Sequence, residues 1–393
     1  MKQYHMNKFI PQRRKLLQGG FAGLTVFMGN HFLPAPLKAA ALSKASLGEL
    51  LPADENGVRL PKGFTSRVVA HSGQNIFGYT WHSAPDGGAV FAAEDGGWIY
   101  VSNSEMKDKA GGVGALRFDR QGEVVDAYSI LNNTTRNCAG GHTPWQTWLS
   151  CEEIDKGEVW ECDPFGKKAP QVRRSLGLFK HEAVAVDINN HQLYLTEDER
   201  DGRLYRYTSN AVDAAGNLDL DDGFLEVAEV IQGRIGQVRW HQLPDPLATT
   251  TPTRKQVTNS SAFDGGEGIW FHDGRIYFTT KGDDRVWAYD TQNNNLSIVY
   301  NAAFYLWPVL TGVDNITANA KGDLLVAEDG GNMQIVVVTN EAAHPLLQIV
   351  DQNRSEITGP AFSPDGSRLY FSSQRGKTGR SEDGITYEIT GPF

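Results

Sequence analysis

The segment HEAVAVDINNHQLYLTED, residues 181–198, contains the pattern that decides the fold. A short strand with alternating apolar residues comes first, an Asn-rich turn follows, and a second apolar strand ends in two acidic residues. Alternation with period two, interrupted by turn residues, is typical of an antiparallel β-hairpin. Similar units recur from residue 79 to the end of the chain, which predicts a repeat architecture made of strands.

The spacing of these units identifies the architecture. Six units can be aligned, and where no insertion intervenes their second strands end 44 to 48 residues apart, at positions 153 and 197, 280 and 328, and 328 and 374. Four-stranded propeller blades have this period, whereas a large β-sandwich does not require one. We therefore predict an all-β fold, a six-bladed β-propeller that occupies residues 42–393 as one domain. Residues 209–262 interrupt the spacing and are predicted to be an insertion between blades.

Composition excludes several classes of protein. The chain has 393 residues with 40% hydrophobic residues, enough for a large core, and only three cysteines, too few for a disulfide framework. Its 47 acidic and 37 basic side chains give a formal net charge of −10, which argues against a nucleic-acid partner.

The first 41 residues differ from the rest. They contain six basic and no acidic residues, the pair Arg13-Arg14 before a short Gly-rich apolar stretch, and Ala39-Ala40-Ala41. This pattern predicts a cleaved twin-arginine signal peptide, with the export machinery as a partner and a periplasmic or secreted protein. We expect no stable membrane anchor. Without these residues, 31 basic and 47 acidic side chains leave a charge of −16 on residues 42–393.

The acidic residues have a regular place in the repeat. Cys138 and Glu153 are 15 residues apart, as are Glu182 and Glu197, and Asp314 and Glu328 are 14 apart. In a hairpin, the start of the first strand and the end of the second emerge on one face. We therefore predict one rim of the central channel to collect a set of ligands: Glu94, Cys138, Glu153, Glu182, Glu197, Glu267, Asp314 and Glu328.

This predicted rim has the chemistry of a metal site. Carboxylates crowded around one axis repel one another unless they hold protons or bind cations. Many oxygen ligands suit calcium, and a thiolate among them indicates a transition metal such as iron. Cys151 and Cys162 stand symmetrically about a predicted hairpin turn, so they could form a disulfide and leave Cys138 as the odd thiol.

Several motifs resemble those of the PhoX-type bacterial alkaline phosphatases over essentially the whole mature chain. They are NCAGGHTPW at residues 137–145, CEE at 151–153, FKHEA at 179–183 and AEDGG at 327–331. The resemblance implies a six-bladed propeller with iron and calcium ions in the channel mouth that hydrolyses phosphate monoesters. It also implies roles: Cys138 as the iron thiolate ligand, Glu153, Glu182 and Glu267 as bridging carboxylates, and Glu197, Asp314 and Glu328 as calcium ligands.

The chain departs from that family in two places. An Asp-Arg-Pro-Glu run supplies a phosphate-binding arginine in the phosphatases, whereas this chain reads Asp264-Gly265-Gly266-Glu267. An early Asn-His-Glu stretch is here Asn103-Ser104-Glu105. We predict that Arg375 or Lys281, each at the end of a second strand, takes the place of the missing arginine.

The sequence thus predicts a metal-dependent phosphatase acting on a small-molecule phosphate ester, and we expect a monomer. No Gly-x-Ser-x-Gly motif supports a serine hydrolase. Two alternatives stay open. One is a calcium-dependent lactonase or other ester hydrolase, which needs one cation and no cysteine. The other is a metal-binding propeller whose catalysis has weakened with the change at Gly265.

Overall fold

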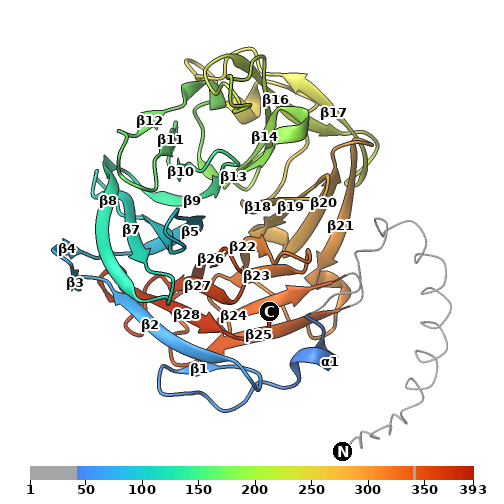
Figure 1. Cartoon of the computed structure of the whole chain (residues 1–393). Helices are drawn as coiled ribbons and strands as arrows, with labels where there is room; N and C mark the ends of the chain where they lie inside the picture. The colour runs from blue at the N-terminus through green and yellow to red at the C-terminus, as the bar shows by residue number, and fades with distance from the viewer. Residues whose placement is uncertain (1–41, 340–341) are drawn as a thin grey trace, which may run out of the picture.

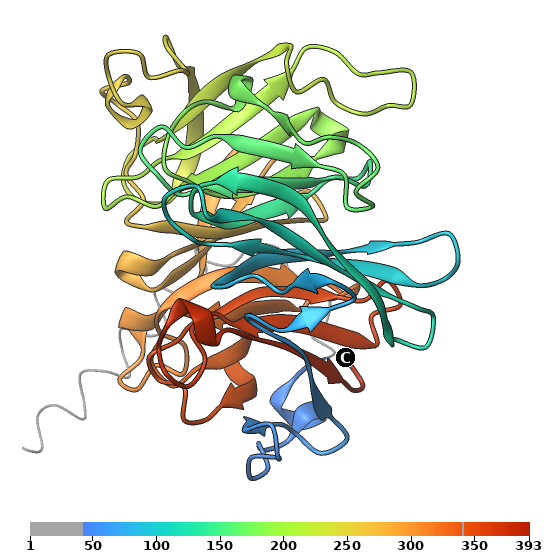
Figure 2. The ribbon, with the colours of Figure 1, turned by 90° about the vertical axis from the view of Figure 1, so that its left-hand side faces the viewer.

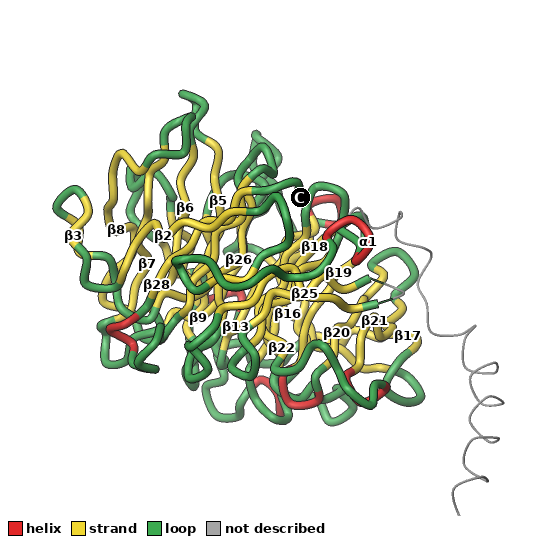
Figure 3. Tube along the Cα trace, turned by 90° about the horizontal axis from the view of Figure 1, so that it is seen from below, coloured by secondary structure: helices red, strands yellow, loops and turns green. Residues whose placement is uncertain are grey.

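The computed structural model describes residues 42–339 and 342–393, and strands dominate this part of the chain (Figure 3). The predicted signal peptide, residues 1–41, lies outside the described residues. Within them no helix has the length and apolar character needed to cross a membrane. The helices are short connections: α1 (Lys44–Leu47), η1 (Arg174–Leu176), η2 (Ile188–Asn190), η3 (Thr253–Lys255), η4 (Lys281–Asp283), η5 (Ala302–Phe304) and η6 (Ser381–Asp383).

The first two blades are four-stranded antiparallel sheets in chain order. The first consists of β5 (Pro85–Ala92), β6 (Trp98–Ser104), β7 (Gly111–Phe118) and β8 (Val124–Thr134). The second consists of β9 (Asn137–His142), β10 (Trp148–Glu152), β11 (Val159–Cys162) and β12 (Gln171–Val172). A separate small hairpin, β3 (Asn75–Ile76) with β4 (Tyr79–Thr80), precedes them.

The third and fourth blades are joined at their outer edges. The third contains β13 (His181–Asp187), β14 (Gln192–Glu197), β15 (Leu204–Ser209) and β16 (Gly223–Val230), followed by β17 (Gly236–Gln242). The fourth contains β18 (Gly266–His272), β19 (Arg275–Thr280), β20 (Arg285–Asp290) and β21 (Asn295–Asn301). Because β17 pairs with both β16 and β21, the two blades share one nine-stranded sheet.

The structure differs here from the predicted insertion at residues 209–262. β16 pairs with β15 over residues 223–227 and is the fourth strand of the third blade, so this part of the segment belongs to the blade. Residues Leu225 and Val227 are buried in the core with their neighbours, which is why the alternating run folds as a strand. The extra strand β17 and the connection from β17 to β18 lie outside the four-stranded repeat.

The last two blades contain strands from the beginning of the described chain. The fifth has β22 (Val313–Ala318), β23 (Leu324–Glu328), β24 (Gln334–Val338) and β25 (Ala343–Ile349), with β1 (Val58–Arg59) at its edge. The sixth has β26 (Ile357–Phe362), β27 (Arg368–Ser373) and β28 (Ile385–Thr390), and its outer strand is β2 (Thr65–His71). The ring is therefore closed by a strand that precedes the first blade.

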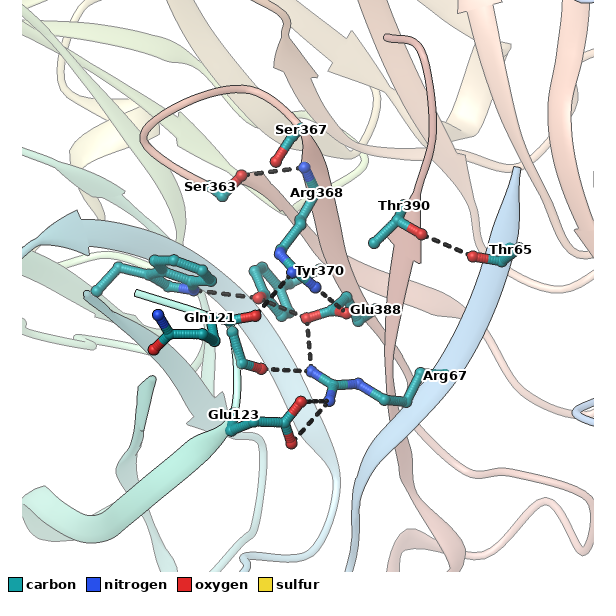
Figure 4. A network of polar contacts seen from close by, with 12 residues as sticks. Thr65, Arg67, Gln121, Glu123, Ser363, Ser367, Arg368, Tyr370, Glu388 and Thr390 are labelled. Atoms are coloured by element: carbon teal, nitrogen blue, oxygen red, sulfur yellow. Dashed lines mark hydrogen bonds and ion pairs between the residues drawn. The ribbon is translucent and has the colours of Figure 1, made fainter. Parts of the chain in front are cut away.

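Polar contacts fix this closing strand (Figure 4). Arg67 of β2 binds the buried carboxylate of Glu388 at 2.9 Å and reaches Glu123 of the first blade at 3.2 Å. Arg368 and the hydroxyl of Tyr370 contact the same Glu388 at 2.6 and 2.7 Å. The network ties β2 to both the last blade and the first.

The six inner strands surround one axis (Figure 1). β5, β9, β13, β18, β22 and β26 each contact the next, and β26 contacts β5. One buried apolar cluster lies between each pair of neighbouring blades in the described chain. Figure 2, a view from the side, shows the teal strands of the first blade between green strands above and the red strands of the last blade below. The predicted all-β propeller is confirmed, and the described residues form six blades.

The prediction that Cys151 and Cys162 could form a disulfide is wrong. Cys151 lies opposite Val159, and Cys162 lies opposite Trp148, so the two cysteines are not paired across β10 and β11. Both thiols are free and buried in different apolar clusters. The turn is longer than a two-residue hairpin, since the ladder between the strands ends at residues 151 and 159.

Candidate metal centre

The first paired residues of each blade mark one end of the channel. There the start of the inner strand pairs with the end of the second strand, as His181 does with Glu197 and Val313 with Glu328. The next residue along each inner strand is an acid or thiol in five of the six blades: Asp86, Cys138, Glu182, Glu267 and Asp314. The next residues after the second strands are Glu105, Glu153, Asp198, Lys281, Asp329 and Gln374.

A register shift aims these side chains at the axis. The ladder between the inner and second strands is interrupted beside the acid or thiol in each of these blades, for example between His181 and Val184 and between Gly266 and Ile269. A bulge bends a strand and redirects its side chains, which is why bulges occur beside active sites. In four of the five blades the residue that follows is Gly or Ala, because the strands crowd here. A Cβ on Gly87 would lie 2.5 Å from the Cα of Ala139.

The side chains meet in four overlapping groups. Within each group the possible ligand atoms all lie within 4.8 Å of one another. The groups combine eight carboxylates with one thiol: Cys138 with Glu153 and Glu182; Glu182 with Glu267 and Asp314; Asp86 with Glu105 and Glu356; and Asp314 with Asp329 and Glu356. Because Glu182, Asp314 and Glu356 each belong to two groups, the four groups form one continuous cluster that could hold several cations.

The chemistry of the donor set fits bound cations. Both carboxylate oxygens of Glu182 are buried and have no hydrogen-bond partner among the described residues. Such a group is costly unless a cation or a proton satisfies it. Burial raises the pKa of Glu182 well above its usual value, and the charges of Glu267 and Glu153 raise it further. Many oxygen donors suit a hard cation such as calcium, and a thiolate beside them suits a transition metal.

The pKa values of other groups in the cluster are raised as well. Burial raises the pKa of Glu153 to about 7, although Lys180 opposes the shift. Burial also raises the pKa of Asp314 to about 7. The thiol of Cys138, which lies 3.7 Å from Asp86, has its pKa raised by burial and by that neighbour. Without cations, therefore, burial disfavours full ionisation of these groups.

Four basic side chains surround the cluster. Lys281 lies 2.8 Å from Glu267 and 3.5 Å from Asp329, and Arg375 lies 2.8 Å from Glu356. Lys180 contacts Glu153 at 2.8 Å, and Arg136 contacts Glu105 at 3.1 Å.

The basic groups stay charged. Burial favours the neutral amine of Lys281, but Glu267 and Asp314 outweigh it and raise its pKa above the usual value. About a third of the side-chain surface of Lys281 and of Arg375 is accessible, so both reach solvent beside the cluster.

The structure brings five of the seven predicted ligands together: Cys138, Glu153, Glu182, Glu267 and Asp314. Glu197 and Glu328 lie elsewhere, because each precedes by one residue the position that faces the cluster. Neighbouring residues of a strand point to opposite faces, so a shift of one position turns the side chain away. Glu197 binds Tyr205 and Arg254, at 2.8 and 3.2 Å.

The prediction that Glu94 belongs to the rim is wrong. It lies in the exposed turn between β5 and β6, at the opposite end of the blade. The acids that the first blade contributes are Asp86 and Glu105. Sequence reasoning missed these two, and it also missed Asp329 and Glu356 of the last two blades. A signal for Asp86 exists: an acid or thiol followed by a small residue recurs at Cys138-Ala139, Glu182-Ala183 and Glu267-Gly268.

Beyond the cluster, the channel contains an apolar cavity of about 380 Å³. Its walls are the middle parts of the inner strands, with small residues such as Gly140 near the cluster and Val186, Trp270 and Phe362 among the larger ones. The clustered carboxylates and the thiol of Cys138 therefore lie at one end of this channel in the described residues.

Comparison with known proteins identifies the family of the chain. The family model for alkaline phosphatase PhoX matches residues 89–162 and 154–303, which together span more than half of the 393 residues. No curated protein matches the chain by sequence.

Two similar solved structures share the fold. Pseudomonas fluorescens PhoX in complex with vanadate, a transition state analogue, has a TM-score of 0.70 and 18% identity, with 87% of this chain and 97% of that chain covered. The holo form of the pyranose dehydrogenase PQQ domain from Coprinopsis cinerea has a TM-score of 0.51 and 14% identity, with 86% and 98% covered. From the match of the family model, the chain belongs to the alkaline phosphatase PhoX family.

Proposed function

We propose that this protein is a metal-dependent phosphatase that hydrolyses phosphate monoesters at an iron and calcium cluster in the channel mouth. The observation that carries the proposal is the convergence of one thiol and eight carboxylates, including the unpartnered Glu182, in a chain of the PhoX family. Cys138 would bind iron, with Glu153 and Glu182 beside it. Glu267 and Asp314, with Asp86, Glu105, Asp329 and Glu356, would bind the remaining cations.

Bound cations would supply Lewis-acid polarisation of the phosphoryl oxygens and an activated oxygen nucleophile. The chain itself provides positive side chains for the phosphate. Lys281 and Arg375 would contact the phosphate oxygens, since both reach solvent beside the ligands. We infer that they replace the arginine absent at Gly265. The predicted export signal and the family resemblance support a periplasmic or secreted location.

The test is hydrolysis of p-nitrophenyl phosphate by metal-loaded protein at neutral to alkaline pH, with metal content measured on the same sample. We expect turnover, iron together with several calcium ions, and a loss of at least about 100-fold in kcat for Glu182→Gln, because one charged ligand is removed. Glu94→Gln is the matched control: its exposed side chain lies at the far end of the blade, and its activity should equal that of the native protein.

Other results would separate the alternatives. A single calcium ion, no iron, and hydrolysis of a lactone but not of the phosphate ester would establish the lactonase instead. Full metal content and ligand binding without turnover of either substrate would indicate a propeller that binds but has lost catalysis. Arg375→Ala with unchanged KM and kcat would remove Arg375 from the phosphate site.

A further inference from the structure

The connection from β21 to β22, residues 302–312, carries an exposed apolar tip. Leu306, Trp307 and Phe304 are 86%, 84% and 72% exposed, the three highest values for large hydrophobic side chains in the described chain. Tyr305 and Val309 beside them are also exposed. The eleven residues of this connection include no charged side chain. An exposed apolar group of this kind marks a contact with another phase or molecule.

The base of this tip is firmly held beside the metal centre. The amide of Thr311 donates to Glu328 at 3.2 Å, and the hydroxyl of Tyr300 donates to the carbonyl of Leu310 at 2.7 Å. Leu310 is fully buried, and Asp314 follows shortly after at the start of β22. The tip therefore projects from a rigid base, on the same end of the propeller as the acidic cluster.

The shape of the tip decides what it contacts. A pocket for a small ligand is concave and buries most of the ligand surface, whereas Leu306 and Trp307 project into solvent. A stable protein interface needs about 800 Å² from each partner, more than one short tip offers. A few aromatic and aliphatic side chains on a projecting loop match the boundary region of a bilayer, where Trp and Tyr are favoured.

We propose that the 304–309 tip inserts into a lipid surface and turns the open end of the channel toward the bilayer. The formal charge of −16 on residues 42–393 disfavours an anionic surface. The fitting partner is consequently a zwitterionic lipid such as phosphatidylcholine. This inference goes beyond the proposed function and does not depend on it, because lipid binding requires no turnover.

The experiment is co-sedimentation of the exported, metal-loaded protein with phosphatidylcholine vesicles. The test variant replaces Phe304, Leu306 and Trp307 with Ser; these side chains are largely exposed, so folding should be retained and is checked by thermal unfolding. Removing three inserted side chains should lower the partition coefficient at least about tenfold. Val125→Ser is the control, since Val125 is 45% exposed at the start of β8, on the opposite end of the blade, and should bind as the native protein does.

Each other outcome overturns the proposal. Native protein that stays in solution with phosphatidylcholine vesicles has no lipid-inserting tip. Equal binding by the native protein and the triple variant places the lipid contact elsewhere. A dimer that dissociates in the triple variant, without vesicle binding by either protein, makes the tip a contact between two copies of the chain.

Discussion

Among single residues, the glutamates at this end of the inner and second strands have two different roles. Glu182 and Glu267 face the channel, while Glu152, Glu197 and Glu328 face into the blade and accept a hydrogen bond from the backbone six residues later. The amides that donate are those of Glu158, Arg203 and Gln334, at 3.2, 3.1 and 2.9 Å. The repeated contact closes the turn between the second and third strands of three blades.

Substitution of Glu328 separates these roles. Glu328→Ala removes the acceptor for the amides of Gln334 and Thr311 in a buried place. We expect the free energy of unfolding to fall by about 1–3 kcal/mol, measured by urea denaturation, with unchanged metal content by elemental analysis. Glu182→Gln is the matched comparison and should lose metal. A metal-depleted Glu328→Ala protein would instead identify Glu328 as a ligand.

Gly265, the position at which the family resemblance implies an arginine, is constrained by its backbone conformation. Its φ is +67°, and its carbonyl accepts the amide of Lys281 at 2.8 Å. A side chain there is strained, so Gly265→Arg should lower the free energy of unfolding by about 1–2 kcal/mol. Gly265→Asn is the control and should cost less, because Asn tolerates this conformation. If Gly265→Arg is as stable as the native protein in urea denaturation, a side chain at position 265 is not strained.

At the scale of the element, β2 closes the ring by joining a blade that it does not follow in sequence. The contact between Arg67 and the buried Glu388 links β2 to β28. In a double-mutant cycle with Arg67→Ala and Glu388→Gln, we expect a coupling energy of about 1–3 kcal/mol from urea denaturation. A coupling near zero would show that the backbone ladder between β2 and β28 alone holds the closing strand.

The elements also show what the sequence could predict. The spacing of the blades can be predicted because each hairpin repeats the same alternation of apolar residues. That spacing alone is enough to place Cys138, Glu153 and Glu182 together. Glu197 could not be separated from Asp198, since a one-residue change in register reverses the face and no periodic signal fixes it. The closing role of β2 could not be read either, because that pairing joins residues more than 300 positions apart.

At the scale of the whole molecule, the acidic excess is concentrated. Residues 42–393 carry −16, and the four groups hold eight carboxylates at one end of one channel. Four basic side chains balance half of them: Arg136, Lys180, Lys281 and Arg375. The remaining repulsion opposes folding unless protons or cations compensate it. Cation binding and pH should therefore act on stability through the same groups.

Removal of the metals should make stability depend on pH. Burial raises the pKa of Glu153 and of Asp314 to about 7 in the folded protein, above the values of about 4 in an unfolded chain. Between these values the folded state holds more protons than the unfolded state, so the stability of chelator-treated protein should fall as pH rises from 5 to 8. The slope is about 1.4 kcal/mol per pH unit for each proton concerned. Bound cations keep the carboxylates ionised and should abolish this slope.

Urea denaturation at pH 5 and 8, with and without chelator, measures the difference in slope. Glu153→Gln should reduce the slope of the chelated protein. Identical slopes in the loaded and chelated proteins would show that these carboxylates do not bind the cations.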